Sequence, residues 1–352
     1  MKKRNVINLI RYYSEGNDSA FRDEAYEIAT DFNLNGDPQL GNYILALLSN
    51  NNSFIPQELN NKSDFFHKVE QSKDTLPLPA TISDDLMGIV NAIGYNAGIN
   101  KFLFSGAPGT GKTESAKQLA RILNRELYVV DFDSIIDSKL GQTAKNISQL
   151  FGEINALHFP EKMIILFDEI DSLAMDRIDS RDLREMGRAT SAVLKGLDSL
   201  NPDAVIIATT NLQGSFDKAL VRRFDKVIDF NRYSQEDLEL IAEAILEDQI
   251  SKFKFVGRNK KLFMKIIKTM KPIPYPGELK NMIRSSIAFS NPADEYDYLT
   301  RLFKQINPSF SGRYKDYQEM GFTLREIEIL TKVSKSSISR ELSKTETIKQ
   351  DK

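Results

Sequence analysis

The spacing of apolar residues changes along this chain, and each change predicts a different kind of structure. In SAFRDEAYEIATDF (19–32) apolar residues recur every three or four positions, and they do so again over 40–48, which predicts two antiparallel helices. A third helix over 4–13 would complete a small bundle. The NGDP turn at 35–38 separates the second and third helices. The apolar stripes predict a packed core, and the alternative is a docking face for a partner.

Beyond this bundle the regular spacing of apolar residues first disappears and then returns. Residues 51–80 are rich in Asn, Ser and Pro, which predicts a linker with a short helix around Phe65 to Val69. Residues 81–231 then alternate strand-length apolar runs (KFLFS, ELYVVDF, KMIILFD and AVIIATT) with helix-like segments. That alternation predicts an α/β domain with a parallel sheet and helices on both faces. From 232 onward the periodicity is helical throughout.

Composition and charge narrow the class of protein. The chain of 352 residues has no cysteine, so disulfides and thiolate metal sites are excluded. Its two histidines are too few for a histidine metal cluster, and a net charge of −2 argues against a general nucleic-acid coat. No run approaches the ~18 apolar residues of a membrane span. We therefore expect a soluble, cytoplasmic protein without a membrane partner.

A glycine-rich motif follows the first apolar run. GAPGTGKT at 106–113 fits GxxxxGK[ST], and it stands between KFLFS and the helical ESAKQLARIL, the strand–loop–helix context that the motif needs. Glycines let backbone N–H groups surround phosphate oxygens, and the helix N-terminus adds positive charge. We expect Lys112 to reach the β- and γ-phosphates of ATP and Thr113 to hold Mg²⁺. The predicted ATP-binding residues of this loop are Gly106, Ala107, Pro108, Gly109, Thr110, Gly111, Lys112, Thr113 and Glu114.

Three further positions fit the same chemistry. MIILFDEID (163–171) is an apolar strand that ends in carboxylates, so Asp168 is expected to hold Mg²⁺ and Glu169 to deprotonate the attacking water. AVIIATTN ends in Asn211, which could sense the γ-phosphate. FDKALVRRFD carries the adjacent Arg222 and Arg223, and guanidinium groups suit developing phosphate charge.

GAPGTGKT, ILFDEIDSL, IIATTN and KALVRRFD together resemble the AAA ATPases, including their second region of homology, over roughly residues 80–290. The resemblance implies Mg-dependent ATP hydrolysis by a ring, most often a hexamer, with nucleotide at each subunit interface. It gives Asn211 the sensor-1 position and makes Arg222 and Arg223 arginine fingers that act on the neighbour's ATP. It also implies a helical lid, in which Gly277 of PGELKN would approach the adenine.

With this resemblance the chain divides into five parts. They are an N-terminal helical domain (1–50), a linker (51–80), the large α/β nucleotide-binding domain (81–231), a helical lid (232–295) and a C-terminal helical segment (296–352) that ends in a disordered tail.

The pore-facing loop leaves the substrate open. In the family this loop commonly reads aromatic–aliphatic–glycine, whereas this chain has Lys139, Leu140 and Gly141. An aromatic wedge grips polypeptide through area and shape, while a lysine adds charge. The alternatives are remodelling of a protein, regulation of a bound partner without threading, and a nucleic-acid substrate. The second pore loop is expected over Met175 to Glu185.

The C-terminal segment supplies a competing indication. TLREIEILTKVSKSSISREL (323–342) has the pattern of helix, turn and helix, and it resembles the helix-turn-helix of resolvases and small repressors. We expect Lys335, Ser336, Ser337, Ser339 and Arg340 to face outward. Contact with DNA and a structural or protein-docking role both remain open for this segment.

Two interpretations follow. In the first, a ring-forming ATPase remodels or regulates a protein partner. Small bacterial AAA proteins with this layout resemble ATPases encoded beside subtilisin-like serine proteases, some associated with defence against phage or plasmids, so a separate protease of that kind is one candidate partner. In the second, a DNA-associated ATPase switch uses the C-terminal helix-turn-helix.

Overall fold

The structure is a computed structural model of the chain. It describes residues 3–15, 17–35, 38–48, 63, 65–69, 77–95, 97–136, 142–157, 159–173, 180–212, 218–253 and 255–350. The chain divides into two compact units, Met1–Asp64 and Phe65–Lys352.

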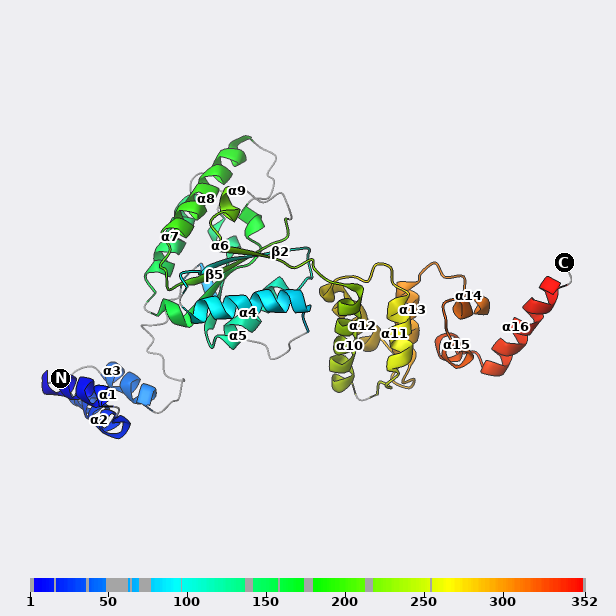
Figure 1. The fold of residues 1–352 in the computed structure, drawn as a ribbon, viewed down its shortest axis with the longest axis horizontal. Coiled ribbons are helices and arrows are strands. Elements are labelled where there is room, and N and C mark those ends of the chain that lie inside the picture. The colour runs from blue at the N-terminus through cyan, green and yellow to red at the C-terminus, as the bar shows by residue number, and fades with distance from the viewer. Residues whose placement is uncertain are drawn as a thin grey trace. The chain divides into compact units, whose positions relative to one another are not determined.

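The first unit is helical, as its apolar spacing predicts. Its helices are α1 (Lys3–Ser14), α2 (Asp18–Asn35) and α3 (Pro38–Leu48) (Figure 1). Helix α2 packs against both of the others, and its Ala25, Ile28 and Ala29 are buried. The three helices thus enclose a small core of their own.

The expected short helix at 65–69 is wrong. Residues Phe66–Val69 form strand β1, which pairs antiparallel with β3 (Glu126–Val130). Phe66 is buried and meets Tyr128 edge-on, with ring centroids 5.8 Å apart, while Lys68 forms an ion pair with Glu126. Because the stabilising partner lies some sixty positions later in the chain, local sequence could not reveal the strand. The range expected to be linker therefore contributes an edge strand to the sheet.

Five further strands complete the predicted parallel arrangement. The sheet has the order β1-β3-β4-β5-β2-β6, with β2 (Lys101–Ser105), β4 (Met163–Phe167), β5 (Val205–Thr210) and β6 (Lys226–Asp229). All neighbouring pairs except β1 and β3 are parallel. Parallel strands bring their carboxyl ends to one edge, so the segments after β2, β4 and β5 converge there.

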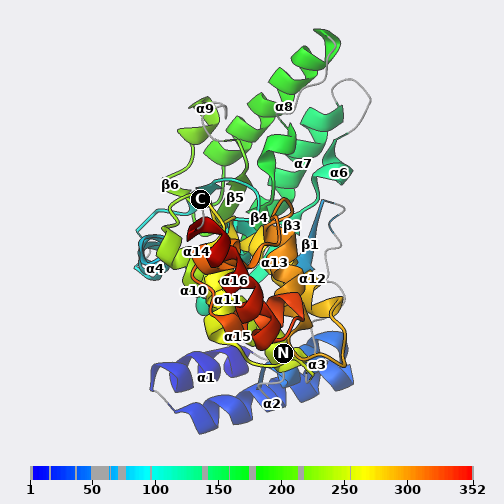
Figure 2. The same cartoon turned by 90° about the vertical axis from the view of Figure 1, so that its right-hand side faces the viewer.

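Helices cover both faces of this sheet, which confirms the α/β prediction. Helices α4 (Ala80–Gly94) and α5 (Lys112–Ile122) pack on one face, against Phe102 and Phe104 of β2. Helices α6 (Phe132–Ile135), α7 (Gln142–Asn155) and α8 (Ser180–Asp198) pack on the other, where Leu103 points (Figures 1 and 2). Alternate side chains along β2 thus point to opposite faces of the sheet and contribute to two separate cores.

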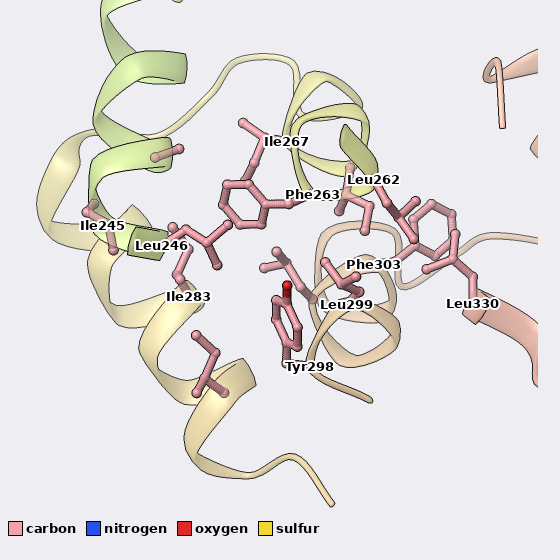
Figure 3. Packing of buried hydrophobic residues seen from close by; sticks show 14 of the residues in the cluster. Ile245, Leu246, Leu262, Phe263, Ile267, Ile283, Tyr298, Leu299, Phe303 and Leu330 are labelled. Atoms are coloured by element: carbon pink, nitrogen blue, oxygen red, sulfur yellow. The ribbon is translucent and has the colours of Figure 1, made fainter. Parts of the chain in front are cut away.

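The C-terminal half is helical, as predicted, and encloses one continuous core. Its helices are α10 (Gln235–Lys252), α11 (Lys260–Lys268), α12 (Pro276–Ala288), α13 (Asp297–Ile306), α14 (Tyr314–Glu319), α15 (Leu324–Thr331) and α16 (Lys335–Gln350). The expected disordered tail is wrong for residues 343–350, which continue the last helix. Figure 3 shows Tyr298 and Leu299 of α13 among the residues of α10–α12, with Leu330 of α15 beside Phe303. The core of the lid helices therefore continues past residue 295 into the C-terminal segment.

No helix in the described ranges is long and apolar enough to cross a membrane.

Candidate active site

The glycine-rich loop leads from β2 into α5 with a backbone that requires glycine. Gly109 and Gly111 have φ values of +76° and +92°, in the left-handed region that other residues rarely adopt. Helix α5 begins at Lys112, directly after Gly111, and no side chain caps its first turn. Its first N–H groups are therefore available to a phosphate, as the motif predicts.

Lys112 lies inside this loop. Its ammonium nitrogen Nζ donates to the carbonyl oxygens of Gly106 (2.8 Å) and Ala107 (3.0 Å) and to Oδ1 of Asn211 (2.8 Å). Burial lowers the pKa of Lys112 below its usual 10.5, and the nearby carboxylates of Asp171, Asp168 and Glu169 counteract only part of that effect. A dianionic phosphate would restore the favourable environment that the buried ammonium needs.

Asp168 and Thr113 meet at the predicted metal position. The Thr113 hydroxyl donates to Oδ1 of Asp168 at 2.9 Å, although the two residues lie in different elements of the sheet domain. A hydroxyl and a carboxylate oxygen are ligands that Mg²⁺ accepts when phosphate oxygens and water complete its octahedron. Among the described residues, no cluster of three or more acidic residues and histidines could hold a metal ion by itself. The donor set thus fits a metal that arrives with the nucleotide.

A residue that sequence reasoning missed, Thr209 of β5, links the Asp168 carboxylate to the backbone of Glu169. Its hydroxyl donates to Oδ1 of Asp168 at 2.7 Å and accepts from the backbone N–H of Glu169 at 2.8 Å. Glu169 has a φ of +52°, an uncommon value for a residue with a side chain. Only the pairing of β4 with β5 brings Thr209 here, and its sole sequence signal was the hydroxyl at the strand end in ATTN.

Asn211 connects the lysine to the candidate base. Its Oδ1 accepts from Lys112, and its Nδ2 lies 3.5 Å from Oε1 of Glu169, a long hydrogen bond. Its backbone N–H donates to buried Asp171 at 3.3 Å. The Glu169 side chain itself is exposed to solvent. A carboxylate held beside an amide and open to water has the geometry of a general base.

These residues share one cavity of about 300 Å³. It is lined by Pro77, Leu78, Pro108, Gly109, Gly111, Lys112, Thr113, Glu114, Ser115, Gln118, Asp168, Glu169, Thr209, Asn211, Tyr233, Pro276, Gly277 and Lys280. Most of the predicted nucleotide and metal residues thus meet, and Gly277 joins them from α12. One end is polar and carries the carboxylates and the lysine. The other includes Pro77, Leu78 and Pro276, which sequence reasoning did not assign and which offer apolar surface to a base.

The lid helices touch the loop directly. The N–H of Gly277 donates to the carbonyl of Gly109 at 2.8 Å, and a Cβ at Gly277 would lie only 2.7 Å from the Gly109 Cα. The Tyr233 hydroxyl donates to the Thr110 carbonyl at 2.7 Å, and burial raises the pKa of Tyr233 to about 12, so the donor proton stays in place. Oδ1 of Asn231 accepts from the N–H of Ala107 at 2.8 Å. Loop and lid are therefore coupled through backbone atoms.

Arg222 and Arg223 lie apart from this cavity. They follow helix α9 (Lys218–Val221), and neither lines the cavity wall. Arg223 bonds Asp198 through Nε (3.2 Å) and a terminal nitrogen (3.3 Å), while Arg222 is exposed. The geometry separates the two arginines: Arg223 is held within its own chain, and Arg222 projects into solvent.

Other predictions fall beyond the described residues. The loop with Lys139, Leu140 and Gly141 lies outside them, as do residues 175–179 of the expected second pore loop. The side chains of its remaining residues, 180–185, are likewise not described.

Comparison with known proteins shows a similarity over the segment that carries this site. Residues 102–232 match the model of the "ATPase family associated with various cellular activities (AAA)". An uncharacterized AAA family ATPase of Sinorhizobium fredii is 35% identical over 182 residues, which cover 48% of this chain and 53% of that protein. A putative 26S proteasome regulatory subunit homolog of Methanothermobacter thermautotrophicus is 33% identical over 44% of this chain and 41% of its own length. A vesicle-fusing ATPase of Dictyostelium discoideum is 34% identical over 38% and 19%.

Solved structures show the same fold. The Escherichia coli MS115-1 HORMA:CdnC:Trip13 complex contains a chain that matches with a TM-score of 0.54 at 16% identity, covering 70% of this chain and 94% of that one. Caenorhabditis elegans PCH-2 matches with a TM-score of 0.50 at 17% identity, covering 69% and 74%. The chain spans about half the length, or less, of the curated relatives that it matches.

Proposed function

We propose that this chain, whose residues 102–232 match the AAA family model, hydrolyses ATP with Mg²⁺ and couples hydrolysis to remodelling or regulation of a protein partner. One observation carries the proposal. Lys112, Asn211 and Glu169 form a continuous hydrogen-bonded row beside the Thr113–Asp168 pair, so a phosphate-binding cation, a metal position and a base face one cavity.

Nucleotide binding uses the two ends of the cavity. The base lies against Leu78, Pro276 and the Tyr233 side of the pocket, and the phosphates lie at the N-terminus of α5. Lys112 then exchanges the carbonyls of Gly106 and Ala107 for phosphate oxygens, which are stronger acceptors because they are charged. Nucleotide binding therefore breaks the hydrogen bonds between Lys112 and the carbonyls of its own loop.

Hydrolysis requires a metal position and a base. Thr113 and Asp168 would hold Mg²⁺, which would supply positive charge to offset that of the phosphates. Glu169 accepts the proton of the attacking water, and Asn211 orients the Glu169 carboxylate. Thr209 fixes the backbone of Glu169 relative to Asp168, so base and metal ligand keep one geometry.

The arginines call for a second chain. Arg222 is exposed and lies outside the cavity of its own chain, which fits action on the nucleotide of a neighbour in a ring, with six subunits as the proposed number. An arginine finger contributes about 10³-fold or more to the rate. Arg223 fixes the end of α9 through Asp198, so we assign the finger role to Arg222 first.

Mixing two inactive variants tests this assignment. Arg222→Ala and Glu169→Gln should each lose turnover while retaining ATP binding, because binding rests on the loop. In a random equal mixture about a quarter of the interfaces combine an intact Arg222 with an intact Glu169, so a comparable share of activity should return. Lys218→Ala on α9 is the matched control and should keep wild-type turnover. No recovery on mixing, with both variants assembled, would sink the trans assignment; wild-type turnover in Glu169→Gln would sink the ATPase site.

The partner that we propose is another protein, bound by a cytoplasmic ring. Relatives named for proteasome regulation and vesicle fusion support a macromolecular partner. A separate subtilisin-like serine protease, in defence against phage or plasmids, is the candidate that the sequence resemblance suggests. The test is purification of tagged Glu169→Gln with ATP from its native host, with and without nuclease. A specific protein retained after nuclease supports the proposal, and the absence of any such protein from an assembled, ATP-bound ring contradicts it.

A further inference from the structure

The last three helices form a compact group on the edge of the lid core. Helix α15 ends at Thr331, and the next residue is Lys332, which has a φ of +61° and whose ammonium bonds Asp294. Helix α16 begins three residues later, and the Glu328 carboxylate accepts from the N–H of Lys335 at 3.1 Å. A short turn, fixed at both ends by side chains, therefore sets the crossing of α15 and α16.

One face of α16 is buried in this group. Ile338 is fully buried with Ile327 and Leu330 of α15, and Leu342 packs against the same cluster. Figure 3 shows Leu330 next to Phe303 of α13, so the group rests on the lid core. The buried stripe anchors α16 and fixes which of its residues face outward.

The opposite face of α16 is exposed and polar. It carries the guanidinium of Arg340, one helical turn beyond Ser336, with Ser337 and Ser343 on either side. Lys335, in the first turn, is also exposed, but it lies about 140° around the helix from Arg340. The hydroxyls of Ser336 and Ser337 lie 3.1 and 2.9 Å from the Ser334 hydroxyl, and each retains further bonding capacity. Among the described side chains of α16, Glu341 is the acidic one, and it lies about 100° around the helix from Arg340.

Neighbouring carboxylates are engaged elsewhere. Asp316 bonds Arg313 and Ser311, Glu326 bonds Lys265, and Glu328 receives the N–H of Lys335. Their charges are thus partly neutralised within the fold. The described part of this face therefore presents one guanidinium, that of Arg340, and several hydroxyls.

We propose that α16 binds duplex DNA by entering its major groove. A helix about 10–12 Å across fits a groove about 12 Å wide, and up to Ser343, the last described side chain of α16, the face that would enter has no bulky apolar side chain. Arg340 can pair with the acceptors of guanine, and Ser336 can bond base edges or phosphate. Lys335 and Ser337, at the helix start, face the phosphate backbone. This inference goes beyond the proposed ATPase function and does not depend on it.

The test measures DNA affinity of the full chain by fluorescence anisotropy. The probe is a fluorescein-labelled duplex of about 30 base pairs with random sequence, titrated with and without ATP at several salt concentrations. Arg340→Ala should weaken binding by about 5- to 150-fold. Ser336→Asp should weaken it similarly through repulsion of phosphate, although an acid in the first turn favours the helix itself. A loss of binding in that variant therefore cannot come from melting of α16, and its thermal unfolding checks this.

The control removes one cation outside this group. Lys252→Ala, at the end of α10, should leave affinity within about twofold, because no groove contact involves it. Wild-type affinity in both Arg340→Ala and Ser336→Asp would overturn the proposal. So would a failure to bind duplex at about 10 µM protein in low salt, which would leave α16 as a protein-docking face. Equal competition by duplex RNA, whose major groove is too narrow for a helix, would also overturn it.

Discussion

The Thr209 hydroxyl is predicted to be necessary for rapid hydrolysis. Thr209→Val keeps the shape of the side chain but removes the donor to Asp168 and the acceptor for the Glu169 N–H. Thr209 is 1% exposed, so water cannot replace the hydroxyl without rearrangement. A hydrogen bond to a charged group contributes about 1.5–3 kcal/mol, which corresponds to a fall in kcat of about 10- to 150-fold if the whole effect reaches the transition state.

The assay separates positioning from folding. Steady-state turnover is measured across Mg²⁺ concentrations, and binding of a fluorescent ATP analogue is measured with and without Mg²⁺. We expect lower kcat and a higher Mg²⁺ requirement, with little change in Mg-free binding, because the loop and Lys112 are untouched. Thr209→Ser should restore most activity.

Thr210→Val is the matched control for this prediction. Thr210 is equally buried on β5, but among the described residues its hydroxyl accepts only from the N–H of Leu212, at 3.1 Å. If the two valine variants lose equal activity, or if Thr209→Val keeps the wild-type Mg²⁺ dependence, the hydroxyl of Thr209 does not position the site and the reasoning fails.

Two further predictions concern the lid and the C-terminal helices. Gly277→Ala should weaken nucleotide binding by about 5- to 150-fold, the equivalent of 1–3 kcal/mol of overpacking, because its Cβ would meet Gly109 at 2.7 Å. Gly152→Ala, which has open space, should bind normally in the same titration. Burial alone would raise the pKa of Glu326, but hydrogen bonds from Lys265 and Thr323 outweigh burial and lower this pKa below 4.5. The stability that ionised Glu326 adds is therefore present above pH 4.5 and lost as the pH falls through the lower folded pKa. Glu326→Gln should cost about 1 kcal/mol in urea unfolding near pH 7 and almost nothing in strong acid, and an equal loss at both pH values would contradict this.

Much of the site was predictable because its signals are local. The loop at 106–113 needs glycine at positions of positive φ, and Lys112 and Thr113 follow at fixed spacing on a helix. Asp168 and Glu169 end an apolar strand, so their exposure at the sheet edge follows from the alternation of strands and helices. Helical periodicity likewise predicts the C-terminal half, where apolar spacing is strong.

The contacts that couple these parts depend on the tertiary structure. Phe66 is a strand residue because β3 supplies its partner, and Thr209 reaches Asp168 because β5 lies beside β4. The approach of Gly277 to Gly109 joins residues far apart in the chain, and no local pattern encodes it. The two adjacent arginines, alike in sequence, differ because Asp198 lies next to only one of them. The sequence by itself thus determined which groups the chemistry has, and packing between distant segments decided how they are held.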